Sequence, residues 1–138
     1  MKSKLFAVLL LALVFVAGPA SARRPVPIID HSDIAATASS GKTVTAGQVK
    51  QAIMVGAAAK GWTTAEQGDG QLLATVNVRG KHTVMVLIAY TSEKYSLTYQ
   101  NSIGMNYDPN AGQPLIHPSY NKWVQGLQEA IRTELFKL

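Results

Sequence analysis

The stretch from Gln71 to Tyr99 constrains the fold more than any other part of this chain. It reads QLLATVNVRGKHTVMVLIAYTSEKYSLTY, with β-branched and aromatic residues crowded between short turn signals. That composition is typical of neighbouring strands on a half-buried pleated surface. We therefore predict an antiparallel β-meander, with strands at 62–67, 71–79, 82–91 and 95–99.

The turn between the two central strands decides which of their faces meet. Gly80-Lys81 suits a two-residue type II′ turn, because glycine supplies the positive φ of its first position. This turn pairs Val76 with Met85. A three-residue loop that pairs Val76 with Val86 stays open, and the change of parity would exchange the two faces.

Segment 82–91 is apolar at consecutive positions, so both faces of this strand are apolar. A half-buried strand would alternate apolar and polar residues. We therefore expect a second layer or a partner chain to shield the second face. A homodimer through that second sheet face is one arrangement that would do so.

Helical patterns flank the meander on both sides. Thr45 and Gln48 form a capping box at the start of the first helix, and Gly61 followed by Trp62 is typical of a helix end. The closing helix starts near Pro118. Its apolar stripe consists of Tyr120, Trp123, Val124, Leu127, Ile131 and Leu135. The predicted fold class is α+β, a three- to four-stranded antiparallel meander between an N-terminal and a C-terminal helix.

Residues 1–22 have the layout of a secretory signal peptide. Lys2 and Lys4 precede an apolar run, which a Gly-Pro break and the small residues 20–22 follow. The run is shorter than the roughly 20 residues of a spanning helix, so we expect cleavage near Ala22 and no transmembrane anchor afterwards. The mature chain would be exported, to the periplasm or outside the cell. Within it we expect a linker or irregular arm at 23–43 and a single domain at 44–138.

Composition excludes several classes of chemistry. The chain has no cysteine, which rules out disulfides, Cys-ligated zinc, iron–sulfur clusters and a thiol nucleophile. Without Lys2 and Lys4, eleven basic residues stand against eight acidic ones, a net charge of +3. Because the domain has no basic block, we do not expect nucleic acid as its partner.

Two clusters are candidate ligand-binding sites. Arg79, Lys81 and His82 meet at one hairpin tip, where they could contact an anion or simply keep a solvated turn from edge association. A second cluster gathers at the start of the closing helix, where backbone N–H groups favour anions. It consists of His117, Tyr120, Asn121 and Trp123, with Tyr107 from the loop-like segment 100–117. The alternative is that this second cluster only caps and packs the helix.

Neither a metal site nor a catalytic motif is predicted. The three histidines are scattered, without the spacing of metal ligands. There is no G-x-S-x-G motif and no pair of carboxylates on a strand, so no catalytic residue is assigned. We expect no cofactor.

One combination of segments resembles a known group of proteins. The order of Trp62, VNVRGKH (76–82), YSLTYQNS (95–102) and IHPSYNKWVQGLQEAI (116–131) resembles small exported bacterial proteins of unknown function. The likeness spans Val49 to Ile131. Many of those proteins look like lipoproteins, but this chain lacks the cysteine that would be acylated. The resemblance implies a fold and an exported location, and no activity.

The sequence therefore favours a non-enzymatic binding or interaction module whose partner is an unknown protein or a small anionic ligand. A first alternative is an envelope inhibitor or stress protein that acts on an exported hydrolase through the hairpin tip 79–82. A second is a small hydrolase without a recognisable motif.

Overall fold

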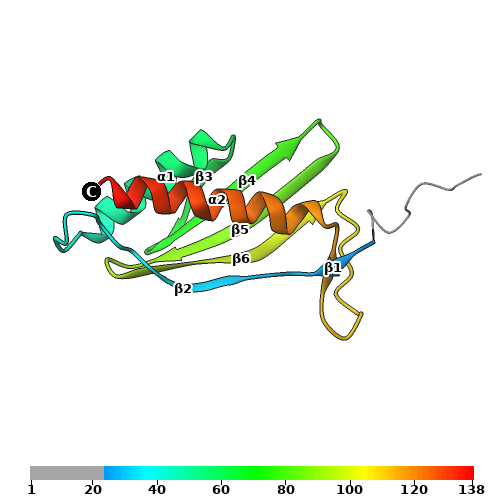
Figure 1. Ribbon diagram of the computed structural model, residues 1–138. Helices are drawn as coiled ribbons and strands as arrows, with labels where there is room; N and C mark the ends of the chain where they lie inside the picture. Colours follow the sequence, from blue (N-terminus) through cyan, green and yellow to red (C-terminus); the bar gives the residue numbers. More distant parts are fainter. Residues whose placement is uncertain (1–23) are drawn as a thin grey trace, which may run out of the picture.

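A five-stranded antiparallel sheet and two helices build the fold of residues 24–138, the part of the chain that this computed structural model describes (Figure 1). The strand order is β2-β6-β5-β4-β3, and β1 pairs separately with β7. The α+β class and the meander are confirmed, with one strand more than expected. The predicted signal peptide lies outside the described residues. The elements are β1 (Val26–Pro27), β2 (His31–Ala35), α1 (Ala46–Ala59), β3 (Thr63–Gly68), β4 (Gln71–Val78), β5 (His82–Tyr90), β6 (Lys94–Ile103), β7 (Leu115–Ile116) and α2 (Ser119–Phe136).

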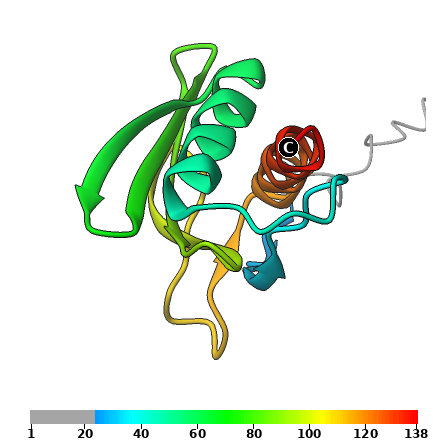
Figure 2. The same cartoon turned by 90° about the vertical axis from the view of Figure 1, so that its left-hand side faces the viewer.

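Both helices pack on the same face of the sheet, which curves around them (Figure 2). On the central strand β5, Val84, Val86 and Ile88 are fully buried, whereas Met85 and Leu87 on the opposite face are half-buried. Figure 2 shows no helix on that outer face. The helices thus account for one apolar face of β5, and a homodimer through the other stays a proposal.

Local signals define both ends of α1 as the sequence predicts. The Thr45 hydroxyl accepts from the Gln48 N–H at 3.1 Å, and the Gln48 side chain accepts from the Thr45 N–H at 2.9 Å. At the other end Gly61 has a φ of 81°, and the Trp62 N–H donates to the Ala57 carbonyl at 3.0 Å. This is a Schellman motif, and Trp62 is only 4% exposed. The tryptophan therefore anchors the end of α1 in the core.

The two helices approach each other closely at Gly56. A Cβ atom built there would lie 2.8 Å from the Ile131 nitrogen and 2.9 Å from the Ala130 carbonyl carbon. No side chain fits in that space. Glycine at position 56 therefore allows the backbones of the two helices to pack closely.

The hairpin between β4 and β5 differs from both predicted registers. Val76 pairs with Val84, and Val78 pairs with His82, so the loop contains three residues. The length and parity of the three-residue alternative are therefore confirmed, whereas its pairing of Val76 with Val86 is wrong. Arg79 and Gly80 both have positive φ, 57° and 65°, which a type II′ turn does not have at both central positions. The Asn77 side chain accepts from the Gly80 N–H at 3.1 Å and stabilises this turn. The contact between Asn77 and Gly80 was not predicted from the sequence, and the predicted type II′ turn is wrong.

The N-terminal arm is also more regular than predicted. Residues 31–35 form the edge strand β2, which pairs with β6 through Ile34 and Tyr95. A register shift interrupts the pairing near Asp33, whose φ is 52°. Because such a bulge breaks the period-two alternation of a strand, the sequence pattern gave no sign of one. The expectation of an irregular arm across 23–43 is therefore wrong for this segment.

Candidate functional site

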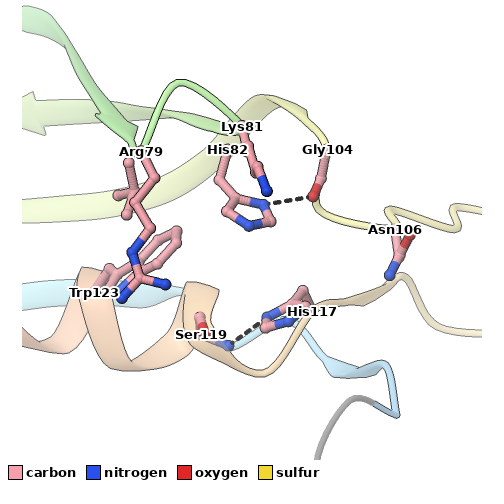
Figure 3. A pocket seen from close by; sticks show the side chains of 9 residues that line it. Arg79, Lys81, His82, Gly104, Asn106, His117, Ser119 and Trp123 are labelled. Carbon is pink, nitrogen blue, oxygen red and sulfur yellow. Dashed lines mark hydrogen bonds between the residues drawn. The ribbon is translucent and has the colours of Figure 1, made fainter.

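The two candidate clusters predicted from sequence meet at a single cavity. It has a volume of about 670 Å³ and opens where the tip of the β4–β5 hairpin faces the start of α2 (Figure 3). Residues from three separate segments, 78–82, 104–106 and 117–123, form its walls. They are Val78, Arg79, Lys81, His82, Gly104, Asn106, His117, Ser119 and Trp123.

The loop after β6 holds the hairpin tip in place. His82 donates from Nδ1 to the Gly104 carbonyl at 2.7 Å, because a carbonyl oxygen can only accept (Figure 3). Gly104 has a φ of 70°, and a Cβ atom there would clash with the Lys81 carbonyl. The tip is therefore seated against this loop and does not project freely. The second ring nitrogen of His82, Nε2, is directed away from Gly104.

His117 and Trp123 form the opposite wall. His117 Nδ1 accepts from the Ser119 N–H at 3.0 Å and so caps the start of α2. The proton of the neutral His117 ring is therefore on Nε2. The His82 ring centre lies 5.9 Å from that of His117 and 6.1 Å from that of Trp123. Two imidazoles and an indole thus surround one space.

The charge of the lining has one sign. Arg79 and Lys81 are exposed cations, and no lining residue carries a carboxylate. Within residues 24–138, neither of these two cations takes part in an ion pair. The ion pairs observed there join other residues: Lys50 with Glu66, Lys94 with Asp33, and Lys137 with Glu134. A cavity lined in this way favours an anion.

Two of the predicted site tyrosines do not line the cavity. Tyr120 is 1% exposed, and its ring meets the Tyr99 ring edge-on, with 5.6 Å between the ring centres. Tyr107 stacks on the same Tyr99 ring, with 4.4 Å between the ring centres. Burial raises the pKa of the Tyr120 hydroxyl far above its usual range. The packing alternative therefore describes Tyr120, whereas Tyr107 remains exposed.

Asn121 has a structural role of its own. Its side-chain oxygen accepts from the Ile29 N–H at 3.0 Å, and its side-chain nitrogen donates to the Pro27 carbonyl at 3.0 Å. The residue thereby ties the N-terminal arm to α2. Of the six predicted ligand-binding residues, Arg79, His82 and His117 line the cavity and Asn121 does not.

Sequence reasoning missed several walls of the cavity. Gly104 and Ser119 were not among the candidates, and Val78 was treated only as a strand residue. A glycine directly after a strand was the one available signal for Gly104. Nothing in the sequence pattern indicates that this glycine meets the Lys81 backbone, because that contact depends on the tertiary fold.

A metal centre finds no support in the geometry. In the described part of the chain, no three His, Asp or Glu side chains are grouped so that they could hold a metal ion.

None of the helices formed by residues 24–138 is long and apolar enough to cross a membrane.

Comparison with known proteins adds no relative. No protein family, no curated protein and no solved structure matches the chain. The resemblance to small exported proteins therefore stays a prediction, and the function has to be argued from the cavity.

Proposed function

We propose that this chain is an exported, non-enzymatic binding protein that holds the anionic group of a small molecule between the hairpin tip and α2. The observation that carries the proposal is the lining of the 670 Å³ cavity. It combines Arg79, Lys81 and His82 and includes no carboxylate that would neutralise them. Export is inferred from the signal-peptide pattern of residues 1–22.

The start of α2 adds its dipole to the same space. The Ser119 and Tyr120 N–H groups are bonded to the His117 ring and to the His117 carbonyl, and the first turn of this helix carries no acidic residue. The positive end of the helix dipole favours an anion nearby. Ser119, in the first turn, lines the cavity. The helix start and the cationic hairpin therefore favour the same kind of ligand.

The backbone at Arg79 supports a role for its guanidinium group. Its φ of 57° lies in the left-handed region, which costs a residue with a Cβ atom about 1 kcal/mol or more relative to its usual conformation. Glycine would adopt this conformation without that penalty. Strained residues of this kind cluster at ligand sites. A turn with no role beyond connecting two strands would not require arginine here.

Binding is a better description of this cavity than hydrolysis. His117 Nδ1 accepts from the Ser119 backbone N–H, so this ring nitrogen is not available as a base for the Ser119 hydroxyl. The lining also lacks a carboxylate that would orient a histidine as a general base. These observations favour the non-enzymatic reading.

The test is an NMR titration of the mature chain with inorganic phosphate, sulfate and acetate. We expect saturable shifts of the His82 and Trp123 side-chain signals with at least one anion. Arg79→Gly removes the guanidinium group and relieves the left-handed strain, so it should weaken binding by about 10- to 100-fold without loss of stability. Lys42→Ala is the control, since it removes one exposed cation that does not line the cavity.

Two results would remove the proposal. One is the absence of a saturable shift with all three anions. The other is equal weakening by Arg79→Gly and Lys42→Ala, which would mean that only net charge matters.

A further inference from the structure

A second, smaller cavity adjoins the first. It has a volume of about 280 Å³ and lies between β4, the end of α1 and the first half of α2. The two cavities share Val78 and Trp123 as walls. We call the second one the apolar groove. Its lining is Lys60, Trp62, Val76, Val78, Lys122, Trp123 and Gly126.

The apolar groove exists because α1 is shorter than α2. Gly56, near the end of α1, already contacts Ile131, so the earlier turns of α2 run past the end of α1 (Figure 1). There α2 alone covers the sheet. Trp62 and Val76 form the floor of the groove and are almost fully buried. Lys60 and Lys122 are exposed and place two positive charges at its rim.

Gly126 keeps this groove open. A glycine within a helix costs about 1 kcal/mol relative to alanine. At Gly56 the missing side chain is required by packing, but a Cβ atom at Gly126 would meet no other atom within 4 Å. Helix packing therefore does not explain Gly126. What its missing side chain does provide is open space above Trp62 and Val76.

We propose that the ligand is an amphiphilic anion whose anionic group occupies the cationic cavity and whose apolar body lies in the apolar groove over Gly126. This inference rests on the proposed function. The two spaces lie side by side, because Val78 and Trp123 line both of them. The groove is large enough for an aromatic ring, since an apolar protein cavity of about 150 Å³ binds benzene. The indole of Trp123 offers such a ring a flat surface at the junction.

The experiment compares two probes with the same anionic group, inorganic phosphate and phenyl phosphate, by titration calorimetry with the mature chain. Burial of the phenyl ring should make phenyl phosphate bind about 10- to 50-fold more tightly. Gly126→Leu places a large side chain in the groove, where a Cβ atom meets nothing within 4 Å. This variant should abolish the difference in affinity between the two probes and leave the affinity for inorganic phosphate unchanged. Gly126→Ala, which adds one methyl group, is the matched control and should keep most of the difference. Arg79→Gly should weaken both probes.

Each outcome decides between the two proposals. Equal affinities of the wild-type chain for both probes would overturn the amphiphilic ligand and leave anion binding intact. If Gly126→Leu weakens inorganic phosphate as much as phenyl phosphate, while thermal unfolding shows that the variant is folded, the groove is not a separate subsite and this inference fails. Failure of both probes to bind would overturn this inference, and anion binding as well if sulfate and acetate also give no saturable shift.

Discussion

Gly56 provides the sharpest test of how the helical layer is held together. Replacing it with alanine puts a methyl carbon within 2.8 to 2.9 Å of three backbone atoms of α2, in Ala130 and Ile131. Carbon atoms at their optimal separation lie about 3.5 to 4.0 Å apart. Because backbone atoms cannot rotate away as a side chain can, α2 itself has to move. That movement would loosen the packing between the two helices.

The expected magnitude follows from two opposing effects. Overpacking of this kind costs typically about 1 to 3 kcal/mol, and contact with backbone favours the upper end of that range. Against this, alanine in place of glycine within a helix contributes about 1 kcal/mol of stability. We therefore expect Gly56→Ala to lower the free energy of unfolding by about 2 kcal/mol.

Gly126→Ala is the matched control for this effect. It is the same substitution in the other helix, at a position where the new methyl group meets nothing within 4 Å. It should raise the free energy of unfolding by about 0.5 to 1 kcal/mol. Urea unfolding followed by circular dichroism measures both variants. A Gly56→Ala variant as stable as the wild-type chain would refute the close contact between α1 and α2.

Two further predictions concern aromatic residues. Trp123 is half-buried and lines both cavities. Trp123→Ala should therefore lower the free energy of unfolding in urea by about 1 to 3 kcal/mol, less than the loss of a fully buried tryptophan. A loss above about 4 kcal/mol would contradict its partial exposure. Burial raises the folded-state pKa of Tyr120 above the unfolded value near 10, so above that pH the unfolded chain loses a proton that the folded chain keeps. Stability should then hold up to about pH 10 and fall by up to about 1.4 kcal/mol per pH unit above it. The fall should be shallower in Tyr120→Phe, and an equally steep fall in that variant would rule out Tyr120 as its source.

Features that depend on neighbours in sequence were predictable. The capping box at Thr45 and the helix end at Gly61 each involve residues a few positions apart, and both have the predicted geometry. The apolar stripe of α2 was also predictable, because helical spacing alone places its members on one face. Tyr120, Val124, Leu127, Ile131 and Leu135 of that stripe are buried.

Features that depend on pairing or on special backbone conformations were not predictable. Edge strand β2 has no alternating pattern, because a register shift near Asp33 interrupts it. The hairpin loop begins with Arg79 in a left-handed conformation, which a residue with a Cβ atom disfavours. The conformational preferences of the residues therefore indicated a type II′ turn at Gly80-Lys81 instead. The candidate clusters were recognised separately, and their meeting at one cavity depends on contacts between segments that are far apart in sequence.

Backbone conformations that the sequence did not predict occur at the cavity, although several of its side chains were predicted. Residues 24–138 include three non-glycine residues with positive φ, and two of them, Arg79 and Asn106, line it. Gly104, also left-handed, lines it as well. Regular strands and helices satisfy their backbone groups internally, whereas loops can direct side chains and backbone groups into a shared space. A chain keeps costly local conformations where function requires them and follows local preference elsewhere. The coincidence of left-handed backbone with a cationic cavity is what the proposed anion site at the hairpin tip would explain.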